Sequence, residues 1–566
     1  MKKRVLSLLL ALSACAVLNA QTEEKGFLTG SFESNSIGYV NDDKTFARVP
    51  DGNFGSNNYL KVDYYRGGLS AGLQMEAYQP ALVGFPSNLQ GTKLANYYIA
   101  WNDDDFAFTA GTFYDQFGSG LLFRSYEDRA LGNNSALLGA RMNWHYKDIF
   151  EAKVLWGVPR MPFTNYVVSE DENNYFYGYP VHTEWSETQV RGADASLSLS
   201  NLLGMEEANL AIEGSVLNRY QKVNVLIEEE GVTPSTTGYS GRVNFEMGGF
   251  VARAEWVDAG QRHYRHNYVE AGVNHNYLIK NGNAQLVDLG YSGGGLGVNL
   301  SMRRLEWMTS YIDNRGIVLD DSSITNNNLN YVPALCAQYS YTLTNIHPYV
   351  PMPYYINGSF VNSGEMGGQL DVYYNFRRGT ALGGKRGMKV NFNLSTYFNL
   401  AEEGSYTPGK MLWMNVNVGM EKYLTRKFKL KMLYAMQQRN TSYGVGNSTA
   451  VANVFVADML YKFTPKLSTR LELQYLLSYE ASNGYDWMAA LLEVNLAPRW
   501  SFFVSDTYNH GMEKVHYYNV GASYTASRTR VALGYGRTRE GLICSGGVCR
   551  MMPAYTGGNL TITTSF

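Results

Sequence analysis

The chain has 566 residues, of which 45% are hydrophobic and 17% charged, and it contains 57 Gly, 44 Tyr and 15 Pro. This apolar content excludes intrinsic disorder, and the near balance of 48 basic and 50 acidic residues argues against nucleic-acid binding. After the first twenty residues the sequence has no apolar stretch long enough for a transmembrane helix, so a helical membrane protein is excluded.

The N-terminus predicts export across a membrane. Basic residues 2–4 precede an apolar stretch over 5–17, which is the pattern of a secretory signal peptide. Cleavage after Ala20 would remove residues 1–20 as the signal and leave 21–566 as one domain. A lipobox ending at Cys15 is the alternative, in which this cysteine would be lipidated. We favour cleavage after Ala20, because an integral barrel gains little from a lipid anchor.

The body of the chain alternates between apolar and polar residues with a period of two, as β-strands with two different faces do. The pattern is clearest over 69–78, 412–421, 427–437 and 467–479. Each run has about ten residues or more, the span of a tilted transmembrane strand, whereas soluble sandwich strands usually have about five or six. Strands in lipid must form a closed sheet, so the predicted fold is all-β, a large transmembrane antiparallel β-barrel.

The connections between these runs alternate between short and long, which is the outer-membrane pattern of periplasmic turns and extracellular loops. Counting hairpins predicts about 24–26 strands, uncertain by about four, around a lumen. The stretch 300–366 is not assigned. The first strand begins near Gly26, which leaves no room for an N-terminal plug domain. The short turns are expected at 66–68, 102–105, 147–148, 248–249, 424–426, 464–466, 497–499 and 526–527, and the long loops at 79–93, 115–135, 158–187, 220–238, 260–283, 400–409, 439–447 and 539–554.

The stretch 114–134 combines glycines with charged residues in an unusual way. One interpretation is a loop that folds into the lumen as a constriction, with its charges paired to the wall, and the other is an ordered surface loop. We slightly favour the constriction. The candidate lumen residues are Arg124, Glu127, Asp128 and Arg129 in this loop, and Lys429, Arg470, Glu472 and Arg530 on the wall, with Lys61, Asp63 and Glu76 also expected there.

Metal and cofactor sites have little support. His263, His266 and His275 occur in a segment that we interpret as an exposed polar loop. Acidic clusters could bind surface calcium through carboxylate oxygens, although solvated turns explain them as well. No cofactor and no metal site is therefore expected. The acidic clusters lie at 42–43, 103–105, 170–172, 228–230 and 320–321.

No catalytic residues are expected either, so we predict that the protein is not an enzyme. Ser482-Asn483-Gly484 matches a motif of outer-membrane phospholipases, but no histidine stands two residues before this serine to act as its base. Asp506 and His510 are near each other in sequence, which is weak support for a barrel protease.

Three cysteines follow the signal. Cys544 and Cys549 flank a short Gly-containing stretch before the last strand, and they could form a disulfide in an oxidising envelope. Cys336 is interpreted as a buried small apolar residue.

The C-terminus resembles the assembly signal of bacterial outer-membrane barrels. Gly558, Leu560, Ile562 and the terminal Phe566 share one face of the expected last strand. This signal is read by the barrel-assembly machinery, which is therefore an expected partner. The strand would end in the periplasm.

The stretch 114–134, the segment 27–36 and the Ala20-Gln21 start together resemble a family of uncharacterised outer-membrane β-barrel proteins of the Bacteroidetes. The resemblance implies the fold, an integral location in the outer membrane with lipid around the wall, and no assigned substrate. On this basis we expect a passive, porin-like channel for small solutes. The alternative is a non-conducting barrel that is a scaffold or partner in a secretion, gliding or assembly complex with other envelope proteins.

Overall fold

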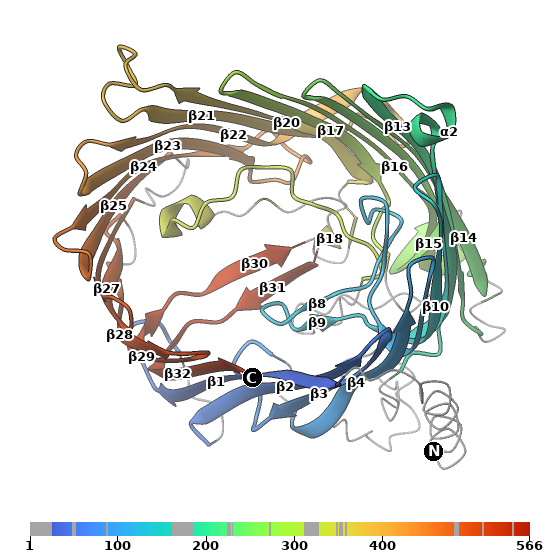
Figure 1. Cartoon of the computed structure of the whole chain (residues 1–566), viewed down its shortest axis with the longest axis horizontal. Coiled ribbons are helices and arrows are strands. Elements are labelled where there is room, and N and C mark those ends of the chain that lie inside the picture. Colours follow the sequence, from blue (N-terminus) through green and yellow to red (C-terminus); the bar gives the residue numbers. More distant parts are fainter. Residues whose placement is uncertain are drawn as a thin grey trace.

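The computed structural model is a closed antiparallel barrel of 24 strands (Figure 1). The described residues include the short helix α2 (Leu199–Leu203) and the 3-10 helix η1 (Thr342–Asn345). The structure describes residues 25–47, 52–85, 89–160, 185–223, 228, 230–270, 273–310, 328–346, 349, 355–356, 359–360, 362–479, 486–511, 514–545 and 548–566. The signal peptide and the alternative at Cys15 lie outside these residues.

The wall consists of consecutive hairpins, so each strand pairs with its neighbours along the chain. In chain order the wall strands are β1 (Phe27–Val40), β2 (Phe54–Arg66), β3 (Leu69–Tyr78), β4 (Gly91–Asn102), β5 (Phe106–Phe113), β10 (Leu137–Tyr146), β11 (Phe150–Pro159), β12 (Gln189–Ser198), β13 (Ala208–Tyr220), β14 (Ser235–Met247), β15 (Phe250–Glu270), β16 (Val273–Gly293), β17 (Leu296–Glu306), β20 (Gly364–Phe376), β21 (Met388–Leu400), β22 (Pro408–Tyr423), β23 (Phe428–Asn440), β24 (Thr449–Lys462), β25 (Leu467–Tyr479), β26 (Trp487–Leu496), β27 (Trp500–Asn509), β28 (His516–Ala526), β29 (Thr529–Thr538) and β32 (Tyr555–Ser565).

Eight further strands are only two to five residues long and form separate two-stranded sheets. They belong to the connections β5–β10, β17–β20 and β29–β32. They are β6 (Gln116–Phe117), β7 (Phe123–Arg124), β8 (Glu127–Asp128), β9 (Asn133–Asn134), β18 (Tyr355–Ile356), β19 (Ser359–Phe360), β30 (Gly541–Ser545) and β31 (Val548–Met552).

The ring closes where the last strand meets the first. β32 pairs with β29 on one side and with β1 on the other, and Ser34 is opposite Ile562 in this second register. The backbone N–H of Gly30 donates to the carbonyl of Phe566 at 2.9 Å, and the N–H of Phe566 donates back to the carbonyl of Gly30 at 2.9 Å. Because these two strands pair, the sheet has no open edge.

The two ends of the barrel differ as expected. All eight predicted short turns are present at one end, and Phe566 lies there beside the β28–β29 turn, where the N–H of Ser565 donates to the carbonyl of Arg528. Three connections at this short-turn end were not predicted. They are 199–207, which contains α2 capped by the Ser198 hydroxyl and by Gly204, and also 294–295 and 377–387.

The predicted loop over 260–283 is wrong. β15 and β16 each have 21 residues and continue as one hairpin, in which Arg262 is opposite Lys280. The apolar alternation fades along this hairpin because a strand that extends beyond the wall no longer needs one apolar face. His263 is correspondingly buried, with 6% of its surface exposed, and is not a residue of an exposed loop. His266 and His275 belong to the same hairpin. The side chain of His266 lies outside the described part, and that of His275 is half-buried.

The wall has an apolar outer face and a polar inner face. In β25 the exposed fraction is 5% at Glu472, 44% at Leu473 and 7% at Gln474, and in β22 it is 0% at Asn417 and 50% at Val418. The predicted alternation of faces is therefore present. Large apolar side chains exposed on the wall include Leu73, Met75, Trp256, Met432, Phe455, Val504 and Leu533. Among the described residues no helix has the length and apolar character needed to span a membrane.

The pairing of Gly30 with Phe566, where the barrel closes, predicts that position 30 requires a glycine. A Cβ at Gly30 would lie 2.3 Å from the Phe566 ring and 2.8 Å from the carbonyl oxygen of Lys61, whereas a Cβ at Gly38 of the same strand would meet nothing within 4 Å. We expect Gly30→Ala to lower the free energy of unfolding by about 1–3 kcal/mol through overpacking. Gly38→Ala is the matched control. Urea denaturation and heat-modifiable gel migration measure the effect, and equal stability of the two variants would contradict this account.

Candidate functional site

Three connections from the long-loop end fold back over the opening of the ring (Figure 1). We call residues 114–136 inner loop 1, residues 328–346 inner loop 2 and residues 539–554 inner loop 3. Figure 1 shows β8 and β9 of inner loop 1, and β30 and β31 of inner loop 3, within the circle of wall strands. The lumen, with these loops and the polar inner wall, is the candidate functional site.

Inner loop 1 begins with a tight turn of apolar residues. β6 pairs with β7, and between them the N–H of Gly120 donates to the carbonyl of Phe117 at 2.9 Å. Gly118 and Gly120 have φ values of +52° and +92°, which favour glycine. The turn holds Phe117, Leu121, Leu122 and Phe123, each at most 1% exposed.

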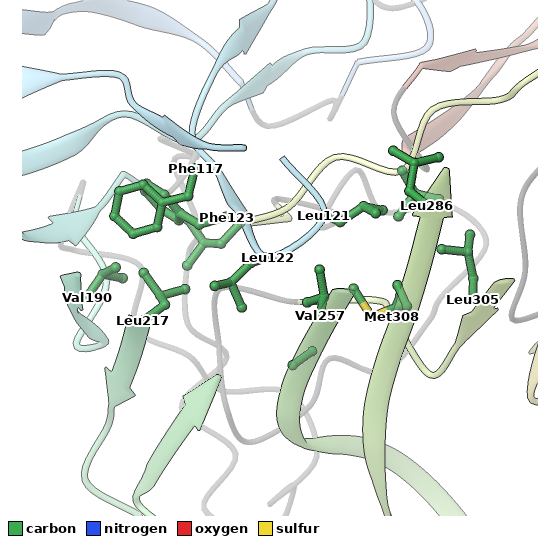
Figure 2. Packing of buried hydrophobic residues seen from close by; sticks show 14 of the residues in the cluster. Phe117, Leu121, Leu122, Phe123, Val190, Leu217, Val257, Leu286, Leu305 and Met308 are labelled. Atoms are coloured by element: carbon green, nitrogen blue, oxygen red, sulfur yellow. The ribbon is translucent and has the colours of Figure 1, made fainter. Parts of the chain in front are cut away.

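These apolar side chains dock onto the wall (Figure 2). The Phe117 ring lies against Gly192 of β12, where a Cβ would be only 2.7 Å from it. Leu122 lies in the same way against Gly238 of β14, where a Cβ would be 2.8 Å from the Leu122 side chain. Burying each large side chain contributes about 1.5–3 kcal/mol, so the loop is held by its apolar tip. The wall and loop partners in this cluster include Val190, Leu217, Val257, Leu286, Leu305 and Met308.

Ion pairs hold the base of inner loop 1. Asp115 is 3.2 Å from Arg141 Nη1 and 2.7 Å from Lys153 Nζ, both on wall strands. Farther round the wall, Glu76 and Arg160 form a bidentate pair at 3.0 and 2.8 Å, with both side chains about 5% exposed or less. A charge buried in this way needs its partner, because an unpaired one is costly.

The four predicted residues of inner loop 1 all have partners. Arg129 donates to Glu33 of β1 at 2.7 Å and lies 4.2 Å above the ring of Tyr59. Glu127 accepts from the amide of Gln74 at 2.7 Å. The Arg124 guanidinium lies 4.1 Å above the Tyr331 ring, and Asp128 accepts from the backbone N–H of Leu131 at 3.1 Å. The loop is thus joined to the wall and to inner loop 2.

Inner loop 2 contacts inner loop 1 and the opposite part of the wall. The N–H of Tyr331 donates to the carbonyl of Gly120 at 2.9 Å. Farther along, the N–H of Leu343 donates to the side chain of Gln474 at 2.9 Å, and Gln437 donates to the carbonyl of Thr344 at 2.8 Å. The apolar cluster beneath η1 consists of Tyr341 and Leu343 with Leu433, Ala435, Ala452, Val454, Val456, Leu476, Trp487 and Ala489 of β23–β26.

The predicted wall residues belong to different surroundings. Arg470 donates to both oxygens of Asp458 at 3.0 and 3.1 Å and also contacts Glu472, while Lys429 pairs with Glu421 at 2.8 Å. Arg530 is exposed, near the short-turn end of β29 and on the strand face opposite the exposed Leu533. The structure therefore joins Arg470 and Glu472 but does not bring all eight predicted residues into one constriction.

Inner loop 3 is a small hairpin. Its register places Cys544 directly opposite Cys549. The side chains of both cysteines lie outside the described part, and the disulfide stays a prediction. The Arg550 guanidinium lies 3.9 Å above the Phe85 ring, and burial lowers the pKa of Arg550 to about 10, so it stays charged at neutral pH. Toward the other side, Arg539 lies 5.6 Å above the ring of Trp487.

The remaining candidate residues either make contacts other than those predicted or lie outside the residues that the structure describes. Asp506 contacts His516 at 2.6 Å, and not His510, whose ring stacks on Tyr508 at 6.2 Å. Asp42 accepts from Arg537 at 2.6 Å. Within the described part, no three His, Cys, Asp or Glu side chains are grouped to hold a metal ion. The stretches 170–172, 320–321 and 482–484 lie outside the described residues.

Several lumen contacts were missed at the level of sequence. Arg303 and Glu365 form an ion pair whose two side chains have no exposed surface. Arg242 of β14 contacts two carboxylates on neighbouring strands. Their position on the polar strand face was a usable signal, but their pairing depends on the register of strands far apart in sequence.

The sequence matches a family of unknown function, DUF6029, over residues 1–566. The chain belongs to this family. No curated protein matches it. The Bacteroidetes origin implied by the resemblance stays a prediction.

Among solved structures, the chain is similar to the siderophore receptor PirA from Pseudomonas aeruginosa, with 10% identity, coverage of 96% of this chain and 81% of that one, and a TM-score of 0.39. It is also similar to the translocation pore of the P pilus usher PapC, with 8% identity, coverage of 95% and 99%, and a TM-score of 0.39. The copper transporter OprC matches with 8% identity, coverage of 96% and 81%, and the same TM-score of 0.39.

The buried pair of Glu76 and Arg160 generates a stability prediction. Glu76→Gln leaves the Arg160 charge buried without its partner, so we expect the free energy of unfolding to fall by about 3–5 kcal/mol. Glu246→Gln breaks an ion pair with Arg253 that is roughly half exposed, and it should cost about 1 kcal/mol or less. Urea denaturation of the refolded barrel compares the two, and a loss at Glu76 no larger than at Glu246 would contradict the buried role.

Cys336 generates a chemical prediction. It is partly buried against the cluster of Tyr349, Tyr397 and Trp413, and burial raises the pKa of its thiol to about 12. Because the thiolate is the reactive form, the folded protein should resist iodoacetamide at pH 8 and react after denaturation. The assay uses a Cys544→Ser, Cys549→Ser background. Rapid alkylation of the folded protein would show that the thiol is accessible.

Proposed function

We propose that the protein is an integral outer-membrane barrel that provides a polar path for small solutes, narrowed by the inner loops. The observation that carries this proposal is the arrangement of the two wall faces. Val418 is 50% exposed and Leu473 is 44% exposed, whereas their polar strand neighbours Asn417, Glu472 and Gln474 are buried. A lipid bilayer suits such an outer surface, since a charge at its midplane costs about 2–4 kcal/mol.

The orientation follows from the two ends of the barrel. Short turns belong to the periplasmic side and longer loops to the outside in bacterial barrels. Phe566 ends beside the short turns, so the proposed assembly signal of Gly558, Leu560, Ile562 and Phe566 would be presented from the periplasm to the barrel-assembly machinery. The inner loops would then restrict entry from outside the cell.

The lumen chemistry suits small polar solutes. A barrel of this strand number encloses more space than wall side chains can fill, and the inner loops occupy part of it. Charges on the described lumen surface are mostly paired, as at Arg470 with Asp458 and at Arg129 with Glu33. Mixed and paired charges favour weak ion selectivity. The absence of catalytic function and of a bound cofactor remains part of this proposal, as does a minor role for surface calcium.

One observation favours the second candidate, a non-conducting scaffold for other envelope proteins. Inner loops 1 and 2 cover separate parts of the wall with apolar clusters, which include Phe117 and Leu343 at 0% exposure. Such packing would persist if no solute had to pass. Conductance decides between the two candidates.

Inner loop 3 provides the test variant, because its hairpin forms a two-stranded sheet separate from the wall. Replacing residues 540–553 by a short Gly-Ser linker should widen the path. We expect single-channel steps from the wild-type barrel in planar bilayers and larger steps from this variant. Shortening the 441–448 loop, which connects β23 to β24, is the control and should leave the step size unchanged. A wild type and a variant that are both silent, with co-purification of other envelope proteins, would favour the scaffold.

A further inference from the structure

Charges are separated around the short-turn end of the barrel. Five successive turns between β20 and β29 contain nine basic residues and no acidic residue. Four of the nine are in the turn 377–387, namely Arg377, Arg378, Lys385 and Arg386. The turns 424–427, 463–466, 497–499 and 527–528 add Arg426, Lys427, Lys466, Arg499 and Arg528. We call these five turns the basic arc.

The turns across the ring from the basic arc have the opposite charge. Strands β20–β29 form one side of the ring and β10–β16 the other (Figure 1). The connections 103–105, 147–149 and 199–207 contain six acidic residues and one basic residue, Lys147, and the other turns of that half are uncharged glycine pairs. Mixed signs avoid a large field of a single sign, and such a field is useful for steering a charged partner.

The basic side chains of the arc are available for a partner. All nine residues are exposed, and none forms an ion pair with another residue of the described part. Lys427 donates to the carbonyl of Phe463 at 3.0 Å, and Arg499 donates to the hydroxyl of Tyr524 at 3.4 Å. Successive turns are two strand spacings apart, or about 10 Å. This is close to the Debye length of about 8 Å at physiological ionic strength, so their fields add into one positive patch.

The positive charge continues onto the inner face of the wall. Lys389, Lys462 and Arg530 are exposed, and each is the first or second strand residue beside a turn of the arc. Lys389 shares its strand face with Asn391, and Lys462 shares its strand face with Asp458. Asn391 and Asp458 both contact inner loop 2, so this face is turned toward the lumen. The patch therefore borders the opening of the barrel and not only its rim.

The acidic residues of the inner wall do not neutralise these cations. Glu421 is opposite Lys389 in the register of β21 and β22, but it pairs with Lys429 at 2.8 Å. Asp458 pairs with Arg470 at 3.0 Å. Lys389, Lys462 and Arg530 form no ion pair within the described part of the chain. The terminal carboxylate of Phe566, beside the last turn of the arc, is a single negative charge at one end of the patch.

We propose that the basic arc is a docking surface for a soluble protein whose contact face is acidic. Ten neighbouring strands span roughly 40 Å along the wall. This width accommodates a standard interface of about 800 Å² per partner. Opposite charges steer such an encounter and fix its register, and the acidic turns across the ring would repel the same face of the partner. The partner would therefore be seated over one side of the opening.

Anionic lipid headgroups fit this distribution less well. Lipid would surround the barrel on all sides, whereas the basic turns occupy one side only. Lipid would also contact the outer face of the wall, whereas Lys389, Lys462 and Arg530 belong to the inner face. The inference requires that the short turns face an aqueous compartment, and it holds whether or not the barrel conducts.

The test measures binding of fluorescently labelled poly-L-glutamate to the full-length barrel in a non-ionic detergent, by fluorescence anisotropy. We expect saturable binding that weakens as NaCl is added. Neutralising four charges of the arc should weaken binding about tenfold or more, because the opposing charges are lost. This arc variant combines Arg377→Gln, Arg378→Gln, Lys385→Gln and Arg386→Gln.

The matched control removes four exposed lysines toward the long-loop end and should leave binding unchanged. It combines Lys44→Gln, Lys222→Gln, Lys410→Gln and Lys514→Gln. Heat-modifiable gel migration should be the same for both variants and the wild type, since all the substituted side chains are exposed. Absence of polyglutamate binding by the wild type, binding that NaCl does not weaken, or an equal effect of the two variants would each overturn the inference.

The lipid alternative has its own measurement. Native mass spectrometry after incubation with phosphatidylglycerol counts the lipids retained by each variant, and we expect equal numbers for the arc variant and the control. A selective loss of phosphatidylglycerol from the arc variant would assign the arc to lipid headgroups and overturn the docking surface. A barrel that binds polyglutamate but gives no conductance would refute the channel and leave the docking surface.

Discussion

The unpaired backbone groups at the edge of a β-sheet are the constraint on which this structure depends. In the proposed lipid setting those groups would have no water to bond, and pairing of the first and last strands, β1 and β32, leaves none of them at an open edge. Closing 24 strands gives a wide ring. The inner loops fill part of this ring, and the polar inner face of the wall supplies partners for them, such as Glu33 and Gln74.

Much of the wall could be predicted because strand alternation and turn formation depend on residues that are close together in the sequence. A strand with one apolar and one polar face must alternate, and Gly67, Gly248 and Gly249 in the turns between strands have positive φ values that glycine adopts easily. The strand count of 24 lies at the lower end of the expected 24–26. The hairpin of β15 and β16 was missed because, outside the region of apolar alternation, nothing in the local pattern separates a strand from a loop.

The sequence predicted many of the polar residues that face the lumen, but it did not predict which of them form ion pairs and hydrogen bonds with each other. The charges of 114–134 do meet the wall, as Arg129 meets Glu33, yet the two residues are 96 positions apart and only strand register brings them together. Arg160 and Glu76 illustrate the same difficulty across 84 positions. Arg470 and Arg530 both follow short turns, but Arg470 binds Asp458 whereas Arg530 is exposed, a difference that alternation alone does not report. Glu255 resembled any other polar-face residue until the tip of inner loop 1 was placed beside it.

Inner loops 1, 2 and 3 each connect two wall strands that pair directly with each other, so the ladder of the wall is continuous below them. Phe113 pairs with Leu137 at the base of inner loop 1, Glu306 pairs with Gly364 below the connection that contains inner loop 2, and Thr538 pairs with Tyr555 below inner loop 3. Each loop can therefore move, lengthen or be exchanged without the loss of a ladder hydrogen bond. The hydrogen-bond ladder of the wall and the inner loops are thus separate parts of one chain. If the proposed channel function holds, a relative with a different solute would need new loop sequences and could keep the same barrel.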